Sequence, residues 1–282
     1  MRPAAGGRRR REISLLPNHV ILILLWIFAV GPLVVLAFNS VKKTAELGRN
    51  PLGFPRDIVL GNFAKAWEVG NFSTTTRNSG ILVVGTVAGV LILGGMAAYS
   101  LSKLNLPGSG PLTLYLLVGT SLPIQLFLVP LFFTWKRLGL VNSLFGLILI
   151  YIAINSPFAI FLLRSYMIQL PSDFEDAARV DGASEWQVFS RIVVPLSWPG
   201  FLTVGLVVAL SVWNEFLLAT VFLTDQNLFT VVTSYANFAT RFGRDWTLTS
   251  AAAVMMVVPV IVIFLSLQRR FVEGLTQGGL KG

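Results

Sequence analysis

One segment stands out between two long apolar stretches: residues 172–199, SDFEDAARVDGASEWQVFSRIVVPLSWP. A simple connection would be shorter and would lack this mixture of charged and apolar residues. Ser172 followed three residues later by Glu175 is the pattern of a capping box, so we expect a helix to begin here. Two alanines then favour helix, and Gly182 is expected to end it because glycine readily adopts a positive φ. The first half of the segment therefore predicts a short helix that ends at a glycine.

A second short helix is expected directly after Gly182. Ser184 and Gln187 repeat the capping pattern, apolar residues follow at helical spacing, and Pro195 is expected to end the element. The product is a pair of helices hinged at Gly182, acidic in its first half and aromatic in its second, which suits docking to another protein. The alternative is a helix lying among lipid headgroups, but such helices usually carry a face rich in Lys and Arg, which this segment lacks.

The rest of the chain consists largely of apolar stretches that are long enough to cross a membrane. A spanning helix needs about 20 mostly apolar residues. Five stretches contain no Asp, Glu, Lys, Arg or His: residues 20–41, 78–102, 104–135, 138–163 and 246–268. The third is too long for one crossing, and Pro and Gly residues at its front leave a span near 112–134. One more span, the fifth in chain order, is expected over about 199–222, where Glu215 interrupts the charge-free run. The total is six spans.

Composition agrees with a membrane protein and excludes several enzyme classes. Of 282 residues, 54% are hydrophobic and 12% are charged, with a mean hydropathy of +0.73, whereas soluble domains carry about 25% charged residues. The chain has no cysteine and only one histidine, His19, which excludes thiolate metal sites, cysteine nucleophiles and His-rich zinc sites. We therefore predict no catalytic residues and no metal site in this chain.

Basic residues near the span ends predict the orientation. The arginine run at residues 8–11 directly precedes the first span, so the N-terminus is expected inside, and six spans place the C-terminus inside as well. Twelve of the 22 Lys and Arg residues then fall in inside segments. The alternative, a nucleic-acid or nuclear-targeting patch, is disfavoured by the adjacent apolar stretch. No small-residue cleavage site follows that stretch, so we expect the first span to be retained.

The hinged segment carries a motif that resembles a known family. EDAARVDGAS at 175–184, followed by IVVP at 192–195, resembles the EAA loop in membrane subunits of bacterial ABC importers. That pattern is Glu-Ala-Ala, three residues, Gly, nine residues, Ile, one residue and Leu-Pro; every spacing is kept, with Asp176 replacing Glu and Val194 replacing Leu. AAYSLS at 97–102, WNEFLL at 213–218 and FVEGLT at 271–276 narrow the resemblance to carbohydrate-type permeases similar to the smaller membrane subunit of the maltose transporter.

The resemblance implies a type I ABC importer permease fold. The chain is then an all-α polytopic membrane protein with six transmembrane helices and a cytoplasmic coupling helix-turn-helix. Its parts would be a basic cytoplasmic segment (1–17), a transmembrane permease domain (18–268) with a coupling loop (171–199) and an external loop (224–247), and a cytoplasmic tail (269–282). It would be a multi-pass protein of a bacterial or archaeal plasma or inner membrane, with both termini cytoplasmic.

The same resemblance implies partners. They are a second, homologous permease subunit, two ATP-binding cassette ATPase subunits, an extracytoplasmic solute-binding protein, a sugar substrate and membrane lipid, with no nucleic acid. The chain contains no GxxxxGK[ST] motif, so ATP and Mg²⁺ would bind to partner subunits and this chain would be no enzyme. The residues expected to couple it to the ATPase are Glu175, Asp176, Ala177, Ala178, Asp181, Gly182, Ala183 and Pro195. Movement of this loop would then displace the fourth and fifth spans.

A carboxylate at membrane depth is costly unless it faces a cavity or a partner, so Glu215 is a functional candidate. The alternative is a position one turn below the external surface, where water reaches the carboxylate. The residues expected to line a substrate pathway are Trp213, Asn214, Glu215, Gln125 and Asn155. The prolines near the last two could open helix backbones toward a pathway or merely kink the helices for packing.

The external loop 224–247 is rich in aromatic residues for a connection. The resemblance implies that it contacts the solute-binding protein, and the expected contact residues are Tyr235, Asn237, Phe238 and Phe242. Aromatic rings also anchor proteins at lipid headgroups, so an interfacial girdle is the alternative.

An ion- or proton-coupled secondary transporter that uses Glu215 is the main alternative function. Such transporters usually have several intramembrane charges and an internal repeat, and neither is found here. The substrate stays open among mono- and oligosaccharides, polyols and phosphorylated glycerol compounds.

Overall fold

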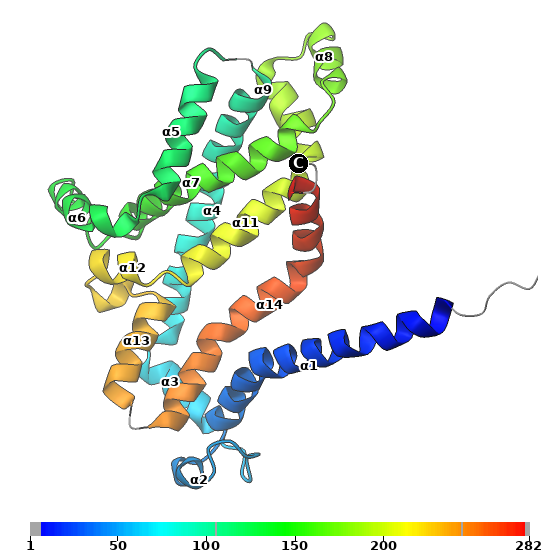
Figure 1. Cartoon of the computed structure of the whole chain (residues 1–282). Coiled ribbons are helices and arrows are strands. Elements are labelled where there is room, and N and C mark those ends of the chain that lie inside the picture. The colour runs from blue at the N-terminus through cyan, green and yellow to red at the C-terminus, as the bar shows by residue number, and fades with distance from the viewer. Residues whose placement is uncertain (1–6, 105, 244, 280–282) are drawn as a thin grey trace, which may run out of the picture. The chain divides into compact units, whose positions relative to one another are not determined.

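The computed structural model describes residues 7–104, 106–243 and 245–279, and within these ranges helices are the only regular secondary structure (Figure 1). The chain forms two compact units, which we describe separately. Unit 1 comprises Met1–Gly70 and Phe238–Met255, and unit 2 comprises Asn71–Asn237 and Met256–Gly282.

Unit 1 is built from helices at both ends of the chain. They are α1 (Gly7–Ser40), α2 (Thr44–Arg49), α3 (Gly61–Val69), the end of α13 (Val231–Phe242) and the beginning of α14 (Trp246–Gly279). The connection that follows α1 is held by the buried Lys42, whose Nζ donates to Asn39 Oδ1 at 3.0 Å and to the Asn50 carbonyl at 2.9 Å. Burying a cation is tolerated here because oxygen acceptors replace its water.

Unit 2 contains the remaining helices. The long ones are α4 (Phe72–Lys103), α7 (Leu144–Ile168) and α11 (Trp198–Trp213). The shorter helices, in chain order, are α5 (Ser109–Ser121), η1 (Ile124–Phe127), α6 (Leu128–Arg137), α8 (Asp173–Val180), α9 (Glu185–Val188), η2 (Phe189–Val193), α10 (Val194–Leu196), α12 (Leu217–Phe222) and η3 (Gln226–Leu228).

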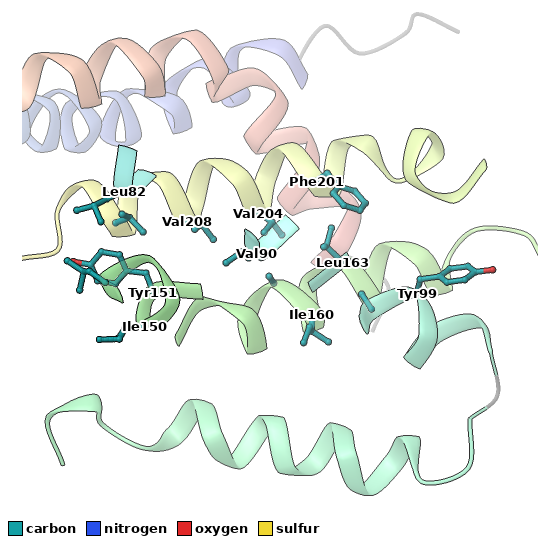
Figure 2. Close-up of a cluster of buried hydrophobic side chains, with 14 of the residues drawn as sticks. Leu82, Val90, Tyr99, Ile150, Tyr151, Ile160, Leu163, Phe201, Val204 and Val208 are labelled. Carbon is teal, nitrogen blue, oxygen red and sulfur yellow. The ribbon is translucent and has the colours of Figure 1, made fainter. Parts of the chain in front are cut away.

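The core of unit 2 lies where α4, α7 and α11 pack against one another. Each helix contributes aliphatic side chains to one buried cluster, as Figure 2 shows for Val90, Leu163 and Val204. Glycines on α4 let α7 approach closely, because a Cβ at Gly85 or Gly89 would collide with an isoleucine of α7. Small residues play this part in membrane helix packing generally.

Six candidate spans emerge from the described residues. Four are single helices: Pro17–Ser40, Phe72–Lys103, Leu144–Ile168 and Trp246–Ser266. Two more are bent pairs, Ser109–Ser121 with Ile124–Arg137 and Glu185–Leu196 with Trp198–Trp213, which turn through 88° and 77°. The all-α class and the six-span count agree with the sequence prediction.

Two spans differ from the continuous helices that we expected. The third, predicted over 112–134, breaks at Leu122, which is extended (φ −85°, ψ 123°) because it precedes Pro123. The fifth, predicted over 199–222, ends at Trp213, and α12 resumes at Leu217. The first break follows from a proline, whereas the second is stabilised by the side chain of Glu215, as described below.

The segment 224–247 is more ordered than the loop that we expected. It contains η3, all of α13 and the beginning of α14. Asp225 begins η3 by accepting a hydrogen bond from the Asn227 N–H at 2.9 Å, a short-range contact typical of turns. Likewise, α14 does not stop where the predicted tail begins at residue 269 but continues to Gly279.

Candidate functional site

The strongest candidate site is the hairpin of α8 and α9, which lies in unit 2 directly after α7 (Figure 1). Its hinge is the glycine that the sequence indicated. Gly182 has φ +86°, and its N–H donates to the Arg179 carbonyl at 3.0 Å while the Ala183 N–H donates to the Ala178 carbonyl at 2.9 Å. This pair of bonds is the Schellman motif, which requires a residue in the left-handed region and therefore favours glycine.

One of the two expected capping boxes forms and the other does not. Ser184 is extended (ψ 157°), and it exchanges hydrogen bonds with Gln187 in a complete capping box. The prediction for Ser172 is wrong: this residue has helical angles (φ −65°, ψ −21°), and its side chain caps nothing. Its intended partner Glu175 instead points into unit 2, where its side chain is 3% exposed and forms an ion pair with Lys103.

The second helix also ends later than we expected. Pro195 does not end it, because the chain continues from α9 through the π-helical turn η2 and α10 as far as Leu196. A proline has no N–H to donate to the preceding turn, and the wider π turn placed before it accommodates this loss without ending the helix.

The outward face of α8 is apolar. Phe174, Ala177 and Val180 follow one another at intervals of three residues, and Phe174 and Val180 are 55% and 88% exposed. Trp186 on α9 is also exposed. Acidic residues surround these side chains, notably Asp176. Exposed apolar side chains with a polar rim are typical of a protein interaction site.

The other residues of the expected coupling set are divided between the two faces of the hairpin. Asp176, Ala177, Asp181, Gly182 and Pro195 are exposed, Ala178 and Ala183 are partly buried, and Glu175 is buried. Arg179 was not in the expected set, yet its Nη1 donates to Asp176 at 2.9 Å. Hydrogen bonding to Glu185 raises the pKa of Arg179 above its ordinary value, so this cation is permanent.

The structure gives Glu215 a defined set of partners at the break between α11 and α12. Its Oε1 accepts from the Leu218 N–H at 2.8 Å, and its Oε2 accepts from the Ala219 N–H at 3.0 Å and the Tyr151 hydroxyl at 2.6 Å. The carboxylate thus satisfies backbone donors at the beginning of α12, as a capping residue does. Tyr151 is a residue that the sequence analysis missed, since only the tertiary fold brings α7 beside this break.

The remaining expected pathway residues are dispersed. Trp213 is buried and donates from Nε1 to the Met256 carbonyl at 3.2 Å, whereas Asn214 and Gln125 are exposed. Asn155 is partly buried and donates to the Tyr151 carbonyl at 2.8 Å. A cavity of about 490 Å³ lies between α5, η1 and α7, and its mainly apolar lining includes Phe127, Ile154 and Pro157.

The expected binding-protein contacts lie on α13. Asn237 is exposed, and Tyr235 and Phe242 are partly buried. Phe238 is only 3% exposed and stacks on Phe242 with ring centroids 4.8 Å apart, so its ring stabilises the fold. The helix is amphipathic, which the period of its apolar residues could have shown.

Comparison with known proteins identifies the family. The sequence profile described as "Binding-protein-dependent transport system inner membrane component" matches residues 90–277, which include the whole α8–α9 hairpin. The chain belongs to this family. It is therefore a multi-pass inner-membrane transport subunit. Membership also disfavours the alternative of an ion-coupled transporter that depends on Glu215.

Several relatives extend the match to nearly the whole chain. The diacetylchitobiose uptake system permease protein NgcG of Streptomyces coelicolor is 35% identical over 277 residues, which cover 98% of this chain and 90% of the relative. The trehalose transport system permease protein SugB of Mycobacterium tuberculosis is 34% identical and covers 95% of each chain. A chain from the crystal structure of a bacterial ABC transporter involved in the import of alginate superposes with a TM-score of 0.80 at 25% identity, covering 95% of this chain and 100% of that chain.

Proposed function

We propose that this chain is a permease subunit of an ATP-binding cassette importer for a sugar, a mono- or oligosaccharide or a polyol. The single observation that carries the proposal is the hinged α8–α9 hairpin with its exposed apolar face inside the region that matches the family. Relatives named for diacetylchitobiose and trehalose support a carbohydrate substrate. The sugar would arrive on an extracytoplasmic solute-binding protein.

The proposed complex contains a second, homologous permease subunit and two ATPase subunits. This chain would be no enzyme, and ATP and Mg²⁺ would bind only to the ATPase subunits. The arginine run at residues 8–11, in the first turns of α1, supports cytoplasmic N- and C-termini, with the hairpin on the cytoplasmic side and α13 outside. The subunit would lie in lipid and bind no nucleic acid.

The exposed face of the hairpin is the proposed ATPase dock. Phe174, Ala177 and Val180 would enter an apolar cleft of the ATPase, and Asp176 would pair with a basic group at its rim. Gly182 sets the angle between the two helices, because its φ of +86° strongly favours glycine over residues with a side chain. Closure of the ATPase around ATP would displace the hairpin as a rigid element.

The two permease subunits would form the pathway between them, and Trp213, Asn214, Glu215, Gln125 and Asn155 remain the proposed contributors from this chain. The break at Asn214 supports the proposal, because irregular backbone at membrane depth is tolerated only where it is buried in protein or lines a cavity. Tyr235, Asn237 and Phe242 are the proposed contacts with the binding protein.

Affinity purification of the chain from its native membrane in mild detergent tests the proposal. We expect the wild type to recover a second permease and a P-loop ATPase, and Gly182→Arg to lose the ATPase while it keeps the permease. Gly139→Arg is the matched control, because Gly139 also has a positive φ (+69°) with open space around it but lies outside the hairpin. Loss of the ATPase from both variants, or uptake that persists without any ATPase and collapses with a proton uncoupler, would contradict the proposal.

A further inference from the structure

Two polar side chains in the C-terminal turns of α4, Tyr99 and Lys103, are four residues apart and therefore share one face, and both are largely buried. Tyr99 lies at one end of the buried cluster (Figure 2) and is 4% exposed. The Lys103 side chain is 9% exposed. Polar groups buried to this degree need partners, and both find them in the α8–α9 hairpin.

Contacts from both polar side chains tie this turn of α4 to the hairpin and to the chain that leads into it. Lys103 Nζ lies 2.7 Å from Glu175 Oε1 on α8, and it donates to the Leu170 carbonyl at 2.8 Å in the chain that leads into α8. The Tyr99 hydroxyl donates to Glu185 Oε2 on α9 at 2.5 Å. Both helices of the hairpin are therefore held to the same turn of α4.

Arg179 closes the network from within the hairpin. Its Nε donates to Glu185 Oε1 at 2.8 Å, and its Nη2 lies 3.7 Å from Glu175 Oε2. Its Nη1 donates to Asp176. Glu175 and Glu185 thus share the Arg179 cation, whereas Asp176, whose side chain is 64% exposed, pairs with Arg179 alone among the residues that the structure describes. Asp176 is therefore accessible to a basic group outside the chain, as are the exposed Asp173 and Asp181.

The backbone packing of α8 explains why these side chains matter. α8 rests on α9 and on η2, the elements that follow it in the chain. α4 packs mainly along α7 and α11 in the core of unit 2, and it reaches η2 as well, where the Tyr99 and Phe189 ring centroids are 5.3 Å apart. The Lys103–Glu175 and Tyr99–Glu185 contacts therefore join the hairpin to a helix that is remote from it in sequence.

We propose that Tyr99 and Lys103 are positioning residues that latch α4 to the hairpin, so that the hairpin and the C-terminal end of α4 move as one body. A displacement of the hairpin then enters the core through the second span, in addition to the fourth and fifth spans to which the hairpin is covalently joined. The inference rests on the proposed function, because an ATPase must displace the hairpin. It adds a route that the sequence analysis did not contain.

Distances between spin labels in the purified complex with partner permease and ATPases test the latch without any sugar. The chain has no cysteine, so labels can be placed at chosen sites once the partner subunits are also made cysteine-free. One pair joins Asp173→Cys on α8 to Ile92→Cys on α4, and a reference pair joins Asp173→Cys to Leu114→Cys on α5; all three sites are exposed. On addition of ATP, we expect the α8–α5 distance to change and the α8–α4 distance to stay constant.

Loosening the latch should release this constraint. In the Tyr99→Phe and Lys103→Met variants, the α8–α4 distance is expected to shift and broaden when ATP is added. Lys103→Met leaves the buried Glu175 carboxylate without this cation and could therefore destabilise the fold. The double variant Lys103→Met/Glu175→Gln removes both charges and serves as the safeguard against misfolding. Lys103→Arg should keep the constant distance, and Lys136→Met, at an exposed lysine of α6, is the matched control.

The outcomes separate the two hypotheses. A wild-type α8–α4 distance that changes with ATP, or latch variants that keep it constant while the α8–α5 distance changes, would overturn the latch alone. If ATP changes no distance although the ATPase is bound, the hairpin is not the element that the ATPase displaces, and the proposed coupling role fails with it.

Discussion

At the scale of single residues, Glu215 is best explained by the donors that surround it. It accepts hydrogen bonds from two backbone N–H groups of α12 and from the Tyr151 hydroxyl. Glu215→Ala removes all three acceptor contacts and should lower the free energy of unfolding by about 1–3 kcal/mol, whereas Tyr151→Phe should cost about 1 kcal/mol. Thermal unfolding of the purified protein in detergent measures both.

The control for this comparison is Glu68→Ala on α3, because Glu68 is exposed and should change stability by less than about 0.5 kcal/mol. In the Tyr151→Phe background, Glu215→Ala should cost less than in the wild type, since the two residues share a hydrogen bond. Equal costs in both backgrounds would mean that this bond contributes nothing to stability.

Asp245, in unit 1, gives stability a predictable dependence on pH. Burial, the largest influence, raises the pKa of Asp245, but hydrogen bonds from the Thr247 hydroxyl, the Leu248 N–H and the Thr44 hydroxyl together hold it below the ordinary value. A depressed pKa contributes stability above the unfolded value of about 4, and this contribution is lost as the pH falls through the native pKa. Asp245→Asn should therefore flatten the fall in melting temperature below about pH 4. A slope identical to that of the wild type would contradict this assignment.

At the scale of helices, the packing of α4 on α7 depends on glycine. Gly89→Leu would push a side chain into Ile152 and should destabilise the chain by about 1–3 kcal/mol. Gly80→Leu lies on the same helix with open space around it, so it shares the change in helix propensity without the clash. Unfolding of the isolated chain in detergent should therefore separate the two variants, and equal stabilities would rule out close packing at Gly89.

The sequence predicted local features of the helices better than contacts between them. The hinge at Gly182 and the capping box at Ser184 depend on neighbouring residues, so their local pattern was enough to predict them. The side chain of Glu175 could not be placed in the same way, because its partner Lys103 lies on another helix. A Tyr and a Lys four residues apart at the end of α4 were the available signal, yet nothing local said which acidic segment they would meet.

At the scale of the whole molecule, the proposed topology would place the hairpin and α13 on opposite sides of the membrane, because only the proposed fifth span separates them. The absence of cysteine makes this directly measurable. With the N-terminus inside, Asn237→Cys should react with a membrane-impermeant maleimide in intact cells, and Asp181→Cys should react only after permeabilisation; both positions are exposed. The reverse pattern would invert the orientation and remove the hairpin from any cytoplasmic ATPase. Labelling of both positions in intact cells would mean that an even number of spans separates them, so the break after Trp213 would turn the chain back instead of completing the crossing.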